Sequence, residues 1–180
     1  MAKETDVNPV THITADAIGP PGKRVFYLQA QQNTRTITLI VEKFQVQSLA
    51  SGVEEFMADI QQKFPHLKEA STNYIEANMY INPPVDPLFR VGELALGYDA
   101  DADRMVLIAR ELVPNQEFDP DAEPIEGRVI RFWCTRDQLR KLAHWGIEVA
   151  KRGRPLCTQC GAPIDPEEGH FCPKKNGHRG

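Results

Sequence analysis

Val25-Phe-Tyr-Leu-Gln-Ala30 and Arg35-Thr-Ile-Thr-Leu-Ile-Val41 are two runs rich in β-branched and aromatic residues, and only four residues separate them. Residues of these types favour extended backbone, and the short connection predicts that the two runs pair as a β-hairpin. The apolar pattern then changes to a helical period, with these residues on one face: Val46, Leu49, Val53, Phe56, Met57, Ile60 and Phe64. Pro65 ends the predicted helix.

A similar succession of strands and helix follows in the second half of the chain. Residues 88–98 and 104–113 predict a second hairpin, and residues 128–134 predict a fifth strand. Thr135 and Gln138 have the spacing of a capping box, which predicts a second helix that runs to about residue 151.

These elements predict an α+β domain over residues 23–152. We expect a mainly antiparallel sheet of five or more strands, with two helices packed on it and a C-terminal zinc-bound lobe. Residues 1–22 are polar, lack a period and end in Gly19-Pro-Pro-Gly22, so we expect an irregular N-terminal segment.

Residues 153–180 contain three of the four cysteines of the chain. Cys157 and Cys160 have the Cys-x2-Cys spacing of a zinc-binding turn, and Cys172 provides a third thiolate. His178 is the preferred fourth ligand, because His170 and Cys172 would point to opposite faces of an extended segment. His170 is the alternative fourth ligand. A Zn2+ ion with four protein ligands has no open position, so the predicted role of the metal is structural.

Charge is distributed unevenly along this chain of 180 residues. Residues 140–180 hold eight Lys/Arg against four acids, whereas the whole chain has a net charge of −4. The basic C-terminal part therefore follows an acidic body, a pattern that favours an anionic partner near the tail. No apolar run approaches membrane-spanning length, and the clustered cysteines fit a reducing compartment, so we expect a cytoplasmic protein without a membrane partner.

Four arginines are candidate anion-binding residues: Arg24, Arg90, Arg128 and Arg131. Their side chains would bind a phosphorylated or otherwise anionic small molecule if two or more converged in a pocket of the sheet. The more common role for such residues is that of surface cations.

Several segments resemble an uncharacterised bacterial protein family that carries a domain-of-unknown-function label. The resemblance rests on residues 19–30, Phe89-Arg-Val-Gly92, the segment from Cys157 to Pro166, and Gly177-His-Arg179. Members of this family are of about this length, so the resemblance spans the chain. It implies no established activity and no catalytic residues.

Three functions are consistent with these observations. The first is a zinc-containing binding or accessory protein whose partner is a protein or an anionic small molecule, and the second is an enzyme that acts on an anionic small molecule. The third is nucleic-acid binding through the basic tail, which an overall pI of about 5.7 disfavours. The closed metal site favours the first, and whether the protein has any catalytic activity stays open.

Overall fold

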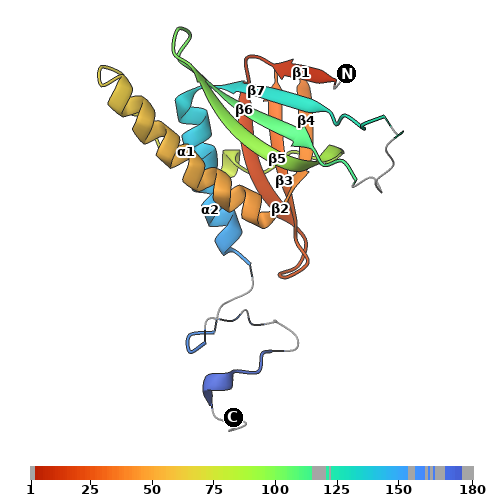
Figure 1. Cartoon of the computed structure of the whole chain (residues 1–180). Coiled ribbons are helices and arrows are strands. Elements are labelled where there is room, and N and C mark those ends of the chain that lie inside the picture. The colour runs from red at the N-terminus through yellow and green to blue at the C-terminus, as the bar shows by residue number, and fades with distance from the viewer. Residues whose placement is uncertain are drawn as a thin grey trace.

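The computed structural model describes residues 3–114, 121, 123–153, 157–160, 162, 164 and 169–175. Within this part of the chain, seven strands form a single sheet with the order β1-β7-β6-β5-β4-β3-β2 (Figure 1). The strands are β1 (Glu4–Val7), β2 (His12–Ile18), β3 (Val25–Gln32), β4 (Arg35–Val41), β5 (Pro87–Asp99), β6 (Arg104–Glu111) and β7 (Val129–Cys134). The helices are α1 (Lys43–Lys63) and α2 (Arg136–Lys151), with short 3-10 turns η1 (Glu76–Asn78) and η2 (Pro173–Lys175).

The sheet is mixed, with antiparallel pairs in the majority. β1 pairs with β7 and β4 pairs with β5 in parallel, whereas the other neighbouring strands are antiparallel. The parallel pair β4–β5 requires a long crossover, which α1 and the segment after it provide. The predicted α+β class is confirmed, as are the two hairpins, β3–β4 and β5–β6.

The N-terminal segment differs from the sequence-based expectation. Residues 1–22 were expected to be irregular, but β1 and β2 lie within them. β2 alternates apolar residues, Ile13 and Ala15 among them, with polar ones, and both faces of its middle are covered, since Ile13, Thr14 and Ala15 are all buried. The Gly19–Gly22 turn then joins β2 to β3, and Gly19 has a φ of +118° that disfavours other residues.

α2 begins at the predicted capping box and buries an aromatic residue against the edge of the sheet. The Thr135 hydroxyl accepts a hydrogen bond from the backbone N–H of Gln138, and the Gln138 side chain accepts one from the backbone N–H of Thr135. Trp145 is fully buried, and its indole N–H donates to the backbone carbonyl of Ala15 on β2 at 2.7 Å. Ile147 is only half-buried, because contact with β2 turns the Trp145 side of the helix inward.

α1 lies beside α2 (Figure 1), and its N-terminal half packs against β5. The buried Gln45 side chain donates to the backbone carbonyl of Val91 at 3.1 Å, which fixes the start of α1 to the sheet. About two turns later, Gly52 of the same helix lies next to Leu96 of β5.

Candidate metal centre

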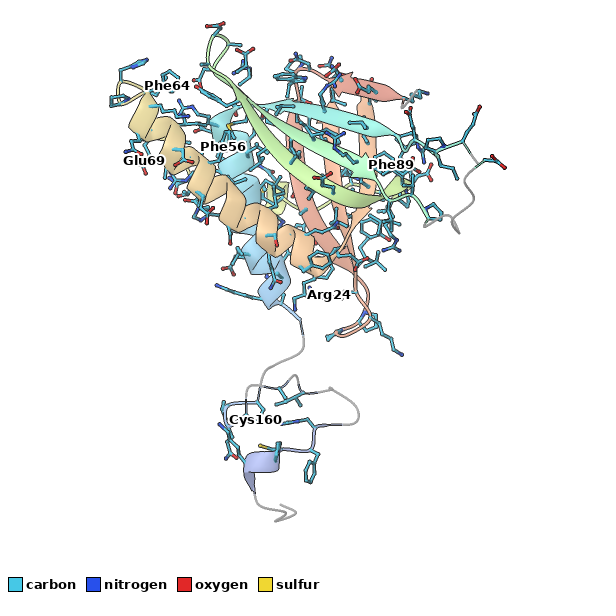
Figure 2. All side chains as sticks on the ribbon, viewed as in Figure 1. Arg24, Phe56, Phe64, Glu69, Phe89 and Cys160 are labelled. Atoms are coloured by element: carbon cyan, nitrogen blue, oxygen red, sulfur yellow. The ribbon has the colours of Figure 1, made fainter. Side chains whose placement is uncertain are left out.

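Three cysteines and one histidine of the C-terminal segment converge in space. The ligand atoms of Cys157, Cys160, His170 and Cys172 all lie within 4.8 Å of one another. The Sγ atoms of Cys157 and Cys172 are 3.8 Å apart, and Cys160 Sγ lies 3.3 Å from His170 Nε2. All four residues come from the segment that follows α2 (Figure 2). This cluster can bind a metal ion.

These spacings agree with a tetrahedral site. With a metal–sulfur distance of about 2.3 Å, two sulfurs of a tetrahedron lie about 3.8 Å apart, and a sulfur and a nitrogen about 3.5 Å apart. A disulfide requires an S–S distance of about 2.05 Å, and all four cysteines of the chain are free. The thiols are therefore spaced to bind one metal ion together, and they are too far apart for a disulfide.

The turn from Cys157 to Cys160 prepares the Cys157 thiol for a metal. The backbone N–H of Cys157 donates to the carbonyl of Ala162 at 2.8 Å, which closes the turn. Hydrogen bonds from the backbone N–H groups of Cys160 and Gln159 lower the pKa of the Cys157 thiol to about 6, and a hydrogen bond with His170 acts in the same direction. A metal binds thiolate, so a thiol that ionises near neutral pH is suited to ligation.

The structure brings His170 into the cluster. Cys172 and His170 were expected to point to opposite faces of an extended segment, and that expectation was wrong. The segment is irregular: Gly169 has a left-handed φ of +70° before it, and η2 follows directly after Cys172. His178, the preferred fourth ligand in the sequence analysis, lies outside the described residues.

The four candidate anion-binding arginines each have a different partner. Arg24 donates to the backbone carbonyl of Val149 at 3.0 Å and lies at the C-terminal end of α2 (Figure 2). Arg90 pairs with Glu42 at 2.6 Å, and Arg128 with Glu111 at 2.8 Å. Arg131 pairs with Glu4 and Asp6 of β1. These contacts join neighbouring elements of the fold. Among the described residues, none pairs with more than one of the four arginines.

The pairs also hold the acidic partners in their charged form. Hydrogen bonds from Arg131 and Trp133 lower the pKa of Asp6 to about 2. Hydrogen bonds from the side chain and backbone of Arg128 lower the pKa of Glu111 to about 2. Both carboxylates are therefore ionised over the physiological range and act as fixed partners of the arginines.

A polar cluster that the sequence did not indicate joins α1 to α2. Glu54 of α1 accepts from Arg140 at 3.0 Å and lies 2.9 Å from Nε2 of His144. Arg140 and His144 are four residues apart, which places them on one face of α2. The spacing of Arg140 and His144 was the one signal in the sequence. Their shared partner Glu54 could not be inferred, because it lies about 90 residues away in the chain.

The remaining cysteine is part of the core. Cys134 is fully buried at the end of β7, and burial raises the pKa of its thiol to about 12. A thiol with such a pKa is protonated at neutral pH and is a poor nucleophile. Among the described residues, no helix is long and apolar enough to cross a membrane.

The fold and the cluster together define the class of this protein: an α+β domain built on a mixed seven-stranded sheet, with a C-terminal Cys3His group that can bind a metal. The chain belongs to the family described as "Protein of unknown function (DUF3090)", whose model matches residues 6–172. The matched region includes all four residues of the cluster and ends at Cys172. Neither a curated protein nor a solved structure matches the chain.

Proposed function

We propose that this protein is a cytoplasmic binding or accessory protein whose C-terminal lobe holds one structural zinc ion. The ligands would be Cys157, Cys160, His170 and Cys172. The observation that carries the proposal is the convergence of four ligand atoms within 4.8 Å, all from one short segment. We call the described residues 157–160, 162, 164 and 169–175 the metal lobe.

Zinc is the metal that this donor set favours. Three thiolates and one imidazole are soft and borderline ligands, and a tetrahedral arrangement of sulfur and nitrogen is typical of zinc. Hard cations such as Mg2+ and Ca2+ prefer oxygen ligands, which this cluster does not offer.

A structural role follows from the number of ligands. Catalytic zinc has three protein ligands and a water in the fourth position, whereas four protein ligands leave no position for water. Without bound water the metal cannot generate the hydroxide that metal-assisted hydrolysis requires. We therefore expect the zinc-loaded protein to hydrolyse neither generic phosphoesters nor peptides. The arginines give the enzyme alternative no support, because each already has its own partner.

Elemental analysis of protein purified without chelator tests the proposal. One zinc per chain is expected in the wild-type protein, and the ion is lost in Cys157→Ser and in Cys172→Ser. Cys134→Ser is the matched control, since that thiol lies in the sheet and should retain the full zinc content. The proposal is overturned if the wild-type protein contains no metal and its three lobe thiols react freely. It also fails if a metal-bound water and a zinc-dependent hydrolytic activity are found.

A further inference from the structure

Two cationic side chains meet at the point where α2 ends. The Nη2 atom of Arg24 and the Nζ atom of Lys43 lie 3.2 Å and 3.6 Å from the position that a Cβ atom would occupy on Gly153. Arg24 directly precedes β3, Lys43 is the first residue of α1, and Gly153 comes after the end of α2. Figure 2 shows Arg24 beside the ends of the two helices. Because Gly153 has no side chain, it leaves both nitrogens uncovered on this side.

The guanidinium group of Arg24 is held in place but is only partly hydrogen-bonded. Its Nη1 atom donates to the backbone carbonyl of Val149 at 3.0 Å, and the group lies 5.0 Å from the centre of the Phe26 ring. Its Nη2 atom has no acceptor among the described residues. A guanidinium that is fixed in position and has N–H groups to spare is arranged to bind an oxyanion.

Neither cation pairs with a carboxylate within the part of the chain that the structure describes. Asp16 attracts the charge of Arg24, but its two oxygens accept from backbone N–H groups at 2.8 Å and 3.1 Å. Glu42, the neighbour of Lys43 in the chain, pairs with Arg90 at 2.6 Å. The carboxylates of this region are therefore bound elsewhere, and both cations keep their full charge.

Arg24 differs in this respect from the arginines that form ion pairs. Burial lowers the pKa of Arg24, because its charged form loses hydration that the attraction of Asp16 does not replace. Hydrogen bonds to carboxylates instead raise the pKa of these arginines: Arg128, Arg131, Arg136, Arg140 and Arg152. The fold thus disfavours the charge of Arg24, and an anion beside it would remove this cost.

The ends of the two helices do not supply the missing negative charge. The C-terminal end of a helix carries about −0.5 of a charge and the N-terminal end about +0.5. The end of α2 explains why a cation is favourable there, but the start of α1 at Lys43 offsets it. About two positive charges therefore remain at this point of the surface.

We propose that Arg24 and Lys43 together bind a doubly charged oxyanion with the chemistry of a phosphate group, in front of Gly153. Two cations match the charge of the dianion, and its oxygens can accept from both nitrogens at once. Inorganic phosphate and a phosphorylated small molecule share this chemistry. The site lies outside the metal cluster, so it goes beyond the proposed zinc-containing role and does not depend on the ion.

Titration of the full-length, zinc-loaded, 15N-labelled protein with inorganic phosphate tests the site by NMR at constant ionic strength. Saturable shifts of the Gly153 amide and of the Arg24 Nε–H signal are expected. Acetate, with one charge, should bind at least tenfold more weakly. Glycerol phosphate distinguishes the two sources: tighter binding than that of inorganic phosphate assigns a phosphorylated small molecule, and weaker binding assigns the free ion. The absence of a saturable shift at Gly153, or an equal affinity for acetate, overturns the proposal.

Four variants test which groups bind the anion. Arg24→Gln and Lys43→Gln should each weaken phosphate binding at least tenfold, whereas Lys63→Gln, at the other end of α1, should leave it unchanged. Gly153→Asp places a carboxylate in front of both cations, so it should abolish phosphate binding and melt at a higher temperature than the neutral Gly153→Asn. Unchanged affinity in both glutamine variants of the site overturns the proposal.

Zinc content is measured in every sample, which separates this inference from the proposed function. A zinc-containing protein that does not bind phosphate refutes the inference alone. A protein without zinc that binds phosphate through Arg24 and Lys43 refutes the proposed function alone.

Discussion

Replacing His170 by alanine removes the nitrogen donor from the cluster and tests the ligand assignment. Structural zinc in finger peptides binds with about 10–16 kcal/mol at pH 7 through four ligands. An equal share gives about 2.5–4 kcal/mol for each ligand, and about 1.4 kcal/mol corresponds to a tenfold change. A water that enters the vacated position recovers part of the loss. We therefore expect His170→Ala to bind zinc roughly 100-fold more weakly than the wild-type protein does.

Competition with a chromophoric chelator at fixed pH measures this difference. Three variants are compared with the wild-type protein: His170→Ala, His178→Ala and His144→Ala. His144 is the matched control, since it lies on α2 and is hydrogen-bonded to Glu54. His178→Ala is expected to retain the affinity of the wild-type protein. Cobalt substitution adds a spectroscopic test, because the d–d bands of a tetrahedral site change when a nitrogen ligand is replaced by water.

The outcome that refutes the assignment is a reversed pattern. If His178→Ala loses zinc while His170→Ala retains it, His178 is the ligand, and the convergence of His170 with the three thiols is not a metal site. If neither histidine matters, the site has three thiolates and an exchangeable fourth position. A vacant position of that kind would remove the argument for a structural role, because the metal would then have room for water.

Three further predictions concern the sheet and helices. Leu142→Ala, at a position 1% exposed, should lower the free energy of unfolding by about 2–5 kcal/mol in denaturant titrations, and Ile147→Ala, half-buried, should cost clearly less. Chelation of zinc should leave the thermal unfolding of the sheet and helices unchanged in circular dichroism, since the main core cluster contains no residue of the metal lobe. Arg131 holds the pKa of Asp6 at about 2, below its usual 3.8, so this pair stabilises the fold above about pH 4, and its contribution is lost as the pH falls through 2. Trp133 donates to Asp6, so its fluorescence should change with a midpoint near pH 2 and should not do so in Asp6→Asn; a wild-type protein without this transition would contradict the pairing.

The elements that the sequence predicted correctly are those with strong local signals. α1 carries apolar residues at helical spacing over five turns, and Pro65 follows its end. The capping box at Thr135 predicted the first residue of α2 correctly. The two hairpins combine a β-rich composition with short connections, and β7 has a β-rich composition directly before the capping box. In each case, neighbours in the chain determine the structure.

The elements that were missed depend on contacts between distant segments. β1 contains a single buried residue, Val7, and becomes a strand because β7 offers a parallel edge. β2 is stabilised by its pairing with β3 and by Trp145 from the second half of the chain. His170 joins the thiols through irregular backbone, which no periodic pattern describes. All four cluster residues were nevertheless candidates from the sequence: the three cysteines from their spacing, because metal ligands recur at characteristic intervals, and His170 as the alternative fourth ligand.

A bound metal would explain how the metal lobe can be ordered while Phe171 remains at the surface. A segment of this length cannot bury enough apolar area to fold by itself, and a metal is one of the few devices that stabilise so small a unit. Ligation of a metal would fix the backbone, so Phe171 would not need to pack inward to order the lobe, and at 81% exposure it does not. A large aromatic side chain that contributes nothing to the core of its own lobe is available for contact with a partner. We therefore predict that Phe171→Ala leaves zinc content and thermal unfolding unchanged; a loss of zinc in this variant would assign the ring a role in folding.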